Sequence, residues 1–370
     1  MRFAIITIID MTNYGNRLQN IALHNILSAY GETETLAISL EGRGCYFYKK
    51  IKNIIEMRYG YMLSSKGVKR VNNTIRQRQK NFLKFEKLGK IRFVRTESVE
   101  KMKDIFDEYD FCFVGSDQVW NPYFWNYENP EKLFSQFFLK GINSSKRIAV
   151  AASFGIEEIP KEWCYQFARE LENFDSISVR EVSGRKIVND LIKRNASILV
   201  DPTLAVNNEI WEKALQMSAL KIQPKEYILK YFLGQENAEY KKVIGKIAKE
   251  NQLSIRALND ESDSEYYTAG PCEFLQCLKN AKLICTDSFH AVVFSIIFNK
   301  PFIVFPRNSK GVDMGDRITT LLSTFNLENR SYNNIKYSDI FYCDFTKSNE
   351  IVSYKRKEFI DFIEKAIHKM

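Results

Sequence analysis

Short apolar runs that alternate with amphipathic stretches constrain the fold of this chain more than any other feature. The first run, residues 3–9, is followed by a polar loop at 12–16 and then by apolar positions at helical spacing from Leu18 to Ala29. This β–loop–α unit predicts a strand that helices cover on both faces. Further buried strands are predicted at residues 35–40, 109–114, 147–151, 176–179 and 197–200.

A second series of strands and helices begins after Asp201-Pro202, which marks the predicted domain boundary. Strands are expected at 227–233, 253–258, 282–285 and 302–305, with helices between them. Such alternation predicts parallel sheets with right-handed crossovers. We therefore predict an α/β fold with two Rossmann-like parallel-sheet domains facing a cleft. The predicted divisions are an N-terminal domain at 1–204, a C-terminal domain at 205–345, and an amphipathic helix within 346–370 that packs back on the N-terminal domain.

One strongly basic segment interrupts the alternation between about residues 45 and 100. From Lys66 to Arg95 the chain has eleven Lys or Arg residues and one acid, Glu86. The favoured interpretation is a solvated helical hairpin that covers the sheet edge, because charge runs usually face solvent. The alternative is contact with a lipid headgroup or an anionic acceptor, which would place the protein peripherally at the inner face of the membrane.

Charge and residue usage limit the class of protein. The net charge of +9 indicates an anionic ligand or surface, but no nucleic-acid-binding module is visible, so we predict no nucleic-acid partner. Seven Cys without a CxxC pair indicate a reducing compartment. Three His without partners at ligand spacing predict no metal site. Without a signal peptide or an apolar run of about 18 residues, the chain is expected to be cytoplasmic.

Polar loops at strand ends are the candidate sites, because ligands of open α/β sheets bind there. Asn13, Gly15 and Asn16 could receive an oxygen-rich ligand at a helix N-terminus, or could form an ordinary turn. In the loop 114–122, Trp120 could stack on a sugar that Ser116 and Gln118 bind by hydrogen bonds. A buried Trp that anchors the core is the alternative.

Two further strand ends carry groups suited to an anion. Arg180 presents a planar fork for a carboxylate or phosphate, unless it forms a salt bridge with Glu181 or another acid. His290 follows a strand directly at a helix N-terminus, where it could act as an acid or clamp a phosphate, although a lone His is more often structural. Other candidates for binding the anion are Asp287, Ser288, Arg307 and Arg317.

Five motifs in this order resemble the polysaccharide pyruvyl transferase family over roughly residues 5 to 330. They are Asn13-Tyr14-Gly15-Asn16, Gly115-Ser116-Asp117-Gln118-Val119-Trp120, Ser178-Val179-Arg180-Glu181, Asp201-Pro202 and Thr286-Asp287-Ser288-Phe289-His290. The resemblance implies a glycosyltransferase-B-like architecture, with the acceptor on the N-terminal domain and the donor on the C-terminal domain. It also implies that Arg180 and His290 hold or activate phosphoenolpyruvate as a co-substrate, without a cofactor or metal.

The sequence departs from the family pattern at two positions. Many members carry Arg where this chain has Ser288, and Arg307 or Arg317 would have to replace that guanidinium. Many carry Asp where this chain has Asn16, which removes a candidate base. Both departures leave the donor and the acceptor open.

Three functions compete at this point. The favoured one is transfer of a pyruvyl group from phosphoenolpyruvate to two hydroxyls of a sugar, as a ketal, in the synthesis of a cell-surface polysaccharide. The acceptor would be a lipid-linked or nucleotide-linked oligosaccharide. A glycosyltransferase that uses a nucleotide sugar on the same fold is the alternative, and a non-catalytic glycan-binding protein is the third.

Overall fold

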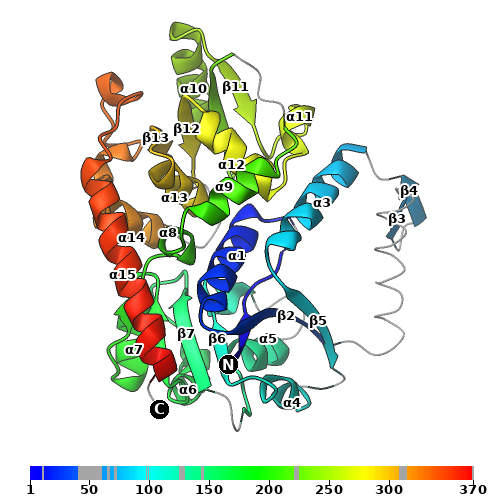
Figure 1. The fold of residues 1–370 in the computed structure, drawn as a ribbon. Helices are drawn as coiled ribbons and strands as arrows, with labels where there is room; N and C mark the ends of the chain where they lie inside the picture. Colours follow the sequence, from blue (N-terminus) through cyan, green and yellow to red (C-terminus); the bar gives the residue numbers. More distant parts are fainter. Residues whose placement is uncertain are drawn as a thin grey trace.

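Two parallel sheets, one from each half of the chain, form the framework of the protein (Figure 1). The computed structural model describes residues 1–10, 12–40, 61–64, 67–70, 73–96, 98, 100–124, 130–142, 146–220, 225–307 and 315–368. Both sheets are parallel and carry helices, so the predicted α/β class with two Rossmann-like domains, a glycosyltransferase-B-like arrangement, is confirmed.

The N-terminal half is built on a seven-stranded sheet in the order β5-β2-β1-β6-β7-β8-β9. Strand β1, which lies inside this sheet, is buried except at its first residue, as expected of a strand covered on both faces. In the register of the sheet, Ile5 lies between Thr35 and Phe113. The elements of this half are β1 (Arg2–Ile6), α1 (Tyr14–Ser28), β2 (Glu32–Leu40), β3 (Tyr61–Ser64), β4 (Gly67–Arg70), α3 (Asn73–Phe85), η1 (Glu86–Leu88), β5 (Ile91–Thr96), α4 (Met102–Phe106), β6 (Phe111–Val114), η2 (Pro122–Phe124), α5 (Pro130–Phe137), β7 (Lys146–Ala152), α6 (Lys161–Leu171), β8 (Ser176–Val179), α7 (Val182–Ile192) and β9 (Ser197–Ile198).

The C-terminal half has a four-stranded parallel sheet in the order β11-β10-β12-β13. Its strand β12 is fully buried and leads almost at once into α13, an apolar helix. The elements of this half are α8 (Pro202–Ala205), α9 (Glu209–Gln216), β10 (Tyr227–Tyr231), α10 (Ala238–Glu250), β11 (Ser254–Ala257), α11 (Ser264–Tyr267), α12 (Pro271–Asn280), β12 (Leu283–Thr286), α13 (Phe289–Ile297), β13 (Phe302–Val304), α14 (Gly315–Thr324), η3 (Glu328–Arg330), η4 (Tyr337–Asp339) and α15 (Thr346–His368).

A continuous apolar core joins the two halves. Tyr14, at the start of α1, stacks on Phe82 of α3 and on Phe274 of α12, with ring centroids 5.2 and 4.6 Å apart. Its hydroxyl donates a hydrogen bond of 3.0 Å to the carbonyl oxygen of Ala269. The N-terminal end of α1 is therefore held firmly against the C-terminal half.

The basic segment differs from its prediction as a helical hairpin. Residues 73–85 form a single helix, α3, and residues 91–96 form β5, a strand at the sheet edge that pairs in parallel with β2. The many charges obscured the strand pattern of Ile91 to Thr96. Arg78 of α3 is not a solvated charge, because it donates hydrogen bonds of 3.3 and 2.8 Å to the carbonyl oxygens of Leu258 and Tyr267. Part of this segment, including residues 65, 66, 71 and 72, lies outside the described residues.

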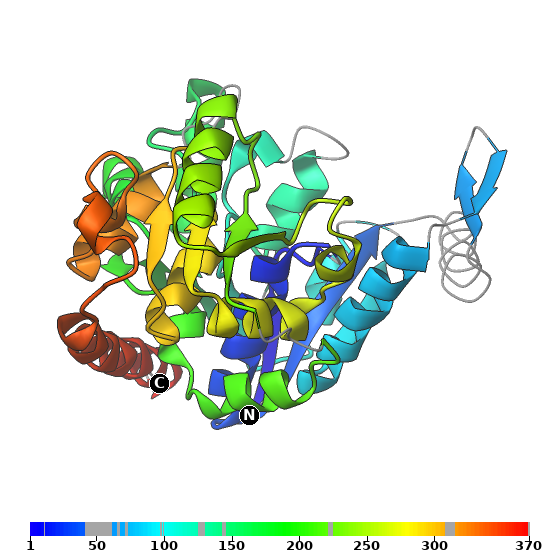
Figure 2. The ribbon, with the colours of Figure 1, turned by 90° about the horizontal axis from the view of Figure 1, so that it is seen from above.

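Helices α3 and α15 flank the junction of the two halves on opposite sides (Figure 2). The last turns of α15 reach the N-terminal half, where Tyr30 donates a hydrogen bond of 3.0 Å to Glu364. Phe362 and Lys365 line a cavity together with Ile177 of β8. In the described part of the chain, no helix combines the length and apolar character required to cross a membrane.

Candidate functional site

His290 lies at the N-terminal end of α13, directly beyond the buried strand β12. The connection is fixed by Asp287, whose carboxylate accepts hydrogen bonds of 2.7 and 2.8 Å from the amides of Leu233 and Gly234. Ser288 is the N-cap residue, but its side chain makes no capping hydrogen bond. The first turn of α13 therefore keeps amide groups and a positive dipole end that suit an anion.

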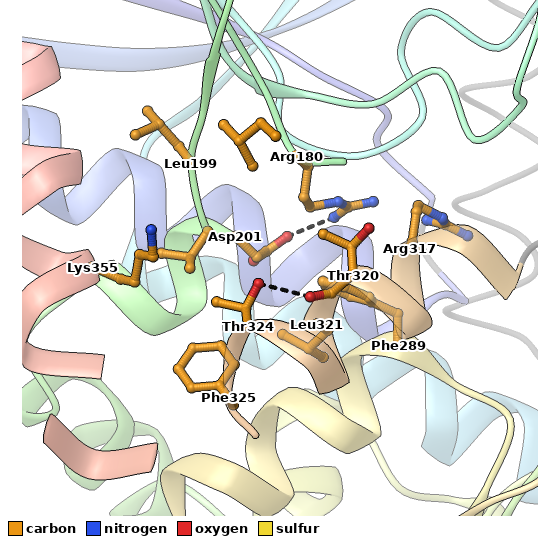
Figure 3. Close-up of a pocket in the computed structure, with 12 residues that line it drawn as sticks. Arg180, Leu199, Asp201, Phe289, Arg317, Thr320, Leu321, Thr324, Phe325 and Lys355 are labelled. Carbon is orange, nitrogen blue, oxygen red and sulfur yellow. Dashed lines mark hydrogen bonds and ion pairs between the residues drawn. The ribbon is translucent and has the colours of Figure 1, made fainter. Parts of the chain in front are cut away.

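Arg180 and Asp201 form a buried ion pair at the ends of β8 and β9. Asp201 caps α8, and its Oδ1 accepts hydrogen bonds from the amide and the hydroxyl of Thr203, at 3.0 and 2.7 Å. Its Oδ2 lies 2.6 Å from Nη1 of Arg180, and Figure 3 shows the two side chains pointing toward each other. Burial alone would raise the pKa of Asp201, but His290 and Arg180 hold that pKa well below its usual value.

The guanidinium of the N-terminal half and the imidazole of the C-terminal half meet at this carboxylate. Nε2 of His290 lies 3.5 Å from Oδ2 of Asp201, the oxygen that also pairs with Arg180. Gly15 of α1 lies against the other side of the ring, because a Cβ at position 15 would overlap with Nδ1. Three side chains and the backbone of Gly15, from four separate segments of the chain, therefore converge across the junction.

A second carboxylate, Asp117, extends the cluster. Its Oδ1 lies 3.6 Å from Nη2 of Arg180 and 4.0 Å from Nη1 of Arg317, and Asn16 donates a hydrogen bond to its Oδ2. Both guanidiniums lie over the ring of Phe289, at 4.4 and 5.9 Å from its centroid. Burial and the nearby Arg180 lower the pKa of Arg317 to about 10, so its guanidinium remains cationic at neutral pH.

The cluster borders a small cavity between the two halves. Arg180 and Asp201 line it from the N-terminal half, and Phe289 and Arg317 line it from the C-terminal half (Figure 3). Its volume is about 40 Å³, which is room for a few water molecules. Lys355 of α15 lies at its far end, so three elements of the C-terminal half and the ends of two strands enclose it.

Several buried nitrogens in this cluster have unused hydrogen-bonding capacity. Nε and Nη2 of Arg180 and Nε2 of His290 make no hydrogen bond within the described residues, although each side chain is at least nine-tenths buried. Unsatisfied buried donors are costly in a folded protein. An anion with several oxygens would satisfy them, so the arrangement suits a phosphate or a carboxylate.

Some of the predicted donor-binding residues lie in the cluster, and others are held by contacts outside it. Arg317 lies in the cluster, but Arg307 pairs with Asp287, with Nε 3.3 Å from the carboxylate and Nη2 2.8 Å from the backbone oxygen. The structure gives Asp287 a supporting task, because its carboxylate holds Leu233, Gly234 and Arg307. Ser288 is 3% exposed and lies at the helix start beside the cluster.

The prediction that Trp120 stacks on an acceptor sugar is wrong. The ring is fully buried, stacks on Phe138 at 5.5 Å and donates from Nε1 to the carbonyl oxygen of Phe137 at 3.1 Å. Ser116 is also fully buried; its hydroxyl bonds to the carbonyl oxygen of Ala151 and lies 3.2 Å from Oδ2 of Asp201. Gln118 packs beside Gly155. None of these three buried side chains presents a surface to a sugar.

The loop before α1 contributes in a way that differs from its prediction. Asn13 caps the helix, because its Oδ1 accepts a hydrogen bond of 3.3 Å from the amide of Asn16. Gly15 gives room to the imidazole of His290, and Asn16 orients Asp117. Of the predicted acceptor residues, Gly15 and Asn16 thus belong to the cluster, while Asn13 supports the helix start.

Two carboxylates of the cluster, Asp117 and Asp201, lie in the five motifs named in the sequence, but the sequence alone assigns them no role. Asp201 has the sequence signature of an N-cap, an acid followed by Pro at the first helical position. The salt-bridge alternative for Arg180 is correct in kind, but its partner is Asp201. Glu181 instead accepts hydrogen bonds from the amides of Phe154 and Gly155, and burial raises its pKa.

Within the described ranges, no group of three or more His, Cys, Asp or Glu residues is arranged to hold a metal ion.

Solved structures with a similar arrangement have very low sequence identity to this chain. Anabaena HepE in complex with UDP and glucose matches over 100% of both chains, with a TM-score of 0.49 and 8% identity. UDP-GlcNAc 2-epimerase from Neisseria meningitidis bound to UDP-GlcNAc matches over 99% of this chain and 100% of that chain, with a TM-score of 0.48 and 9% identity. Neither ligand can be transferred to this chain at such similarity.

Sequence comparison is more specific. General stress protein 30 of Bacillus subtilis (strain 168) is 22% identical over 299 residues, which cover 78% of this chain and 77% of that protein. The family model for polysaccharide pyruvyl transferase matches residues 13–309. That span contains Arg180, Asp201 and His290, and it ends before Arg317. This chain therefore belongs to the polysaccharide pyruvyl transferase family, whose members are transferases of polysaccharide synthesis.

Proposed function

We propose that this protein transfers a pyruvyl group from phosphoenolpyruvate to two hydroxyls of a sugar and forms a cyclic ketal. One observation carries the proposal: Arg180 and His290, from opposite halves, lie at 2.6 and 3.5 Å from the same oxygen of Asp201. A donor with a phosphate and a carboxylate would bind where such hydrogen-bond donors converge. Membership of the family supports the same reaction.

The reaction consumes one donor and two hydroxyl groups. Protonation of the methylene carbon of phosphoenolpyruvate makes its C2 electrophilic, and the first sugar oxygen bonds to C2. The C2–O bond to phosphate then breaks, the electron pair leaves with phosphate, and the second sugar oxygen closes the ketal. The two hydroxyl protons are balanced by one proton on the new methyl group and one on the phosphate.

The cluster residues have distinct parts in this proposal. Arg180 and Arg317 would bind the donor's carboxylate and phosphate, since both guanidiniums are buried and stack on Phe289. The uncapped first turn of α13 would stabilise the departing phosphate. His290 would transfer a proton or bind the phosphate. Because Arg307 pairs with Asp287, Arg317 is the better replacement for the guanidinium that many family members carry at position 288.

Admission of the donor requires movement of side chains or of the two halves. The cavity of about 40 Å³ holds only a few water molecules. Closure of two domains around a substrate is common in enzymes, because it excludes water and completes the catalytic set. The two halves would therefore separate to admit the donor and close around it.

The acceptor and its location are further parts of the proposal. A lipid-linked or nucleotide-linked oligosaccharide at the inner face of the membrane would suit the polysaccharide pathway and the net charge of +9. The basic 66–95 segment, in which Lys80 and Lys87 are exposed, would supply the membrane contact. Binding to vesicles that contain anionic lipids, with neutral vesicles as the control, tests this point.

The test of the reaction is phosphate release with a panel of lipid-linked and nucleotide-linked sugars. Release should require both phosphoenolpyruvate and a sugar, and the product should gain the mass of a pyruvyl ketal. The His290→Gln variant should release phosphate at least about a hundredfold more slowly. Sugar-dependent release of a nucleoside diphosphate without phosphoenolpyruvate would overturn the proposal in favour of a glycosyltransferase.

A further inference from the structure

The two ring nitrogens of His290 have different surroundings. Nε2 is buried and faces Oδ2 of Asp201 at 3.5 Å. Nδ1 lies on the opposite side of the ring, beside Gly15 at the start of α1. His290 as a whole residue is 8% exposed. Nδ1 is therefore the ring nitrogen that lies toward the start of α1, where the predicted acceptor residues Gly15 and Asn16 are located.

The carboxylate of Asp201 is held rigidly toward the ring. Thr203 binds Oδ1 through its amide and hydroxyl, at 3.0 and 2.7 Å, which leaves only Oδ2 for His290. Asp201 is fully buried, and its pKa is well below the usual value because His290 and Arg180 outweigh the effect of burial. An ionised carboxylate accepts hydrogen bonds and cannot donate one. It therefore favours a proton on Nε2.

We propose that Asp201 is a positioning residue that keeps the proton on Nε2 of His290, so that Nδ1 accepts the proton of the attacking sugar hydroxyl. The inference rests on the proposed function, and it selects proton transfer over phosphate binding as the task of His290. The distance of 3.5 Å fits such a pair, because catalytic hydrogen bonds are often long before substrate binds and shorten in the complex. The same division of labour between an acid and an imidazole serves in hydrolytic triads.

The proton and electron balance of this step is simple. As the sugar oxygen bonds to C2, its proton moves to Nδ1 and the electron pair of the O–H bond remains on oxygen. The imidazolium that forms is paired with Asp201. When the C2–O bond to phosphate breaks, the leaving oxygen takes the electron pair and then the proton from Nδ1, which restores the neutral ring.

Other charged groups surround the pair and share in its electrostatics. Arg180 lies on the same Oδ2, at 2.6 Å, while Asp117 and Arg317 lie one contact farther away. The first turn of α1 contains no acid. Asp201 is therefore the carboxylate beside the ring that balances the charge when Nδ1 takes the proton.

The test uses the fact that the chain has three His residues. Selective ¹⁵N labelling of His gives three imidazoles, and the His290→Gln variant identifies the signal of His290. The wild type at neutral pH should show the Nε2–H tautomer for that ring. In Asp201→Asn the amide can donate to Nε2, so the tautomer should change to Nδ1–H.

The kinetic consequence follows from the tautomer. Asp201→Asn should lower kcat by roughly 10²–10⁴-fold, with a much smaller change in KM for phosphoenolpyruvate. Ser116→Ala, which removes a different neighbour of Oδ2, 3.2 Å away, should leave the tautomer unchanged. Thermal unfolding verifies that both variants are folded. If Asp201→Asn fails to fold, the wild-type tautomer still decides, because Nδ1–H would overturn the inference.

The outcomes separate the two proposals. A wild type that releases no phosphate from phosphoenolpyruvate with any sugar would overturn the proposed function, while the NMR signal would still report the contact between Asp201 and His290. An active wild type whose Asp201→Asn variant keeps the tautomer and kcat would overturn this inference alone. A rise in KM for phosphoenolpyruvate with unchanged kcat would also overturn it, because Asp201 would then act through Arg180.

Discussion

Two polar loops that each follow a strand have different tasks in this protein. The loop after β6 and the loop after β12 both follow a buried strand, and both combine polar residues with a ring. After β12, α13 begins within three residues and places His290 at the helix start. After β6, the next described α-helix begins only at Pro130, and residues 115–122 of the loop are buried. Trp120 thereby became part of the core.

The difference teaches that the distance to the next helix decides which side chains face the cleft. A helix start that follows a strand directly projects its first side chains beyond the sheet edge, where ligands bind. A longer loop can fold back, and its ring is then free to fill the core. Asp117 is the exception in the first loop, since it reaches Arg180 and Arg317. Asp117 has a positive φ of 70°, a backbone conformation that residues other than Gly seldom adopt, and this conformation directs its side chain toward the two guanidiniums.

The largest effect is expected for His290, the residue that the short loop presents. His290→Gln should reduce the rate of pyruvyl transfer by about 10²–10⁴-fold, because a group that transfers protons is lost. His24→Gln is the matched control, since His24 lies on α1 and contacts the carbonyl of Thr33 and the amide of Lys90. It should retain wild-type kcat. Equal losses in both variants would mean that the comparison of the loops is mistaken.

Trp120 is the ring of the loop after β6, and its substitution should affect the stability of the fold and not the binding of sugar. Trp120→Ala should lower the free energy of unfolding by about 3–5 kcal/mol, because a large buried ring leaves a cavity. Urea unfolding measures this loss, and the KM for the sugar in the folded variant should remain within about twofold. A large increase in that KM without a loss of stability would restore Trp120 to the acceptor site.

The sequence predicted most of the fold because its strands have clear boundaries. Apolar runs bounded by Gly, Pro or polar loops identified every strand of the two sheets except β5, whose Arg92 and Arg95 alternate with apolar residues inside a basic segment. That failure has a physical cause. An edge strand exposes one side to water, so its pattern is easily obscured by the cations that protect an edge.

The candidate site was predictable only in part. Arg180 and His290 were found because each follows a strand end with a chemically informative side chain. The role of Asp201 depends on which of its oxygens is used by Thr203 and which remains for His290, and no spacing in the sequence determines that. The burial of Trp120 likewise depends on Phe138 and Phe154, which a distant part of the chain supplies.

A smaller effect is expected at Gly15, where α1 meets the imidazole. Gly15→Ala should lower kcat roughly ten- to a hundredfold, because its Cβ would overlap with the ring of His290 and displace it. Gly245→Ala in α10 is the matched control, since a Cβ there meets no atom within 4 Å. That control should keep full activity and gain up to about 1 kcal/mol of stability. Full activity in Gly15→Ala would show that the imidazole can act from another position.

The smallest effect is expected on the pH dependence of stability, through Asp201, the carboxylate that links Arg180 of the N-terminal half to His290 of the C-terminal half. Because the pKa of Asp201 is held below its value in the unfolded chain, its ionised form stabilises the fold above about pH 4. That stabilisation is lost as the pH falls further, since the unfolded chain then binds the proton more readily. Between pH 6 and pH 3 the wild type should lose more stability than Asp201→Asn, by on the order of 1 kcal/mol. Denaturant unfolding at each pH measures the difference. If the two proteins lose stability in parallel, Asp201 is not the ionised link between Arg180 and His290, and the convergence of the two halves on one oxygen has no electrostatic basis.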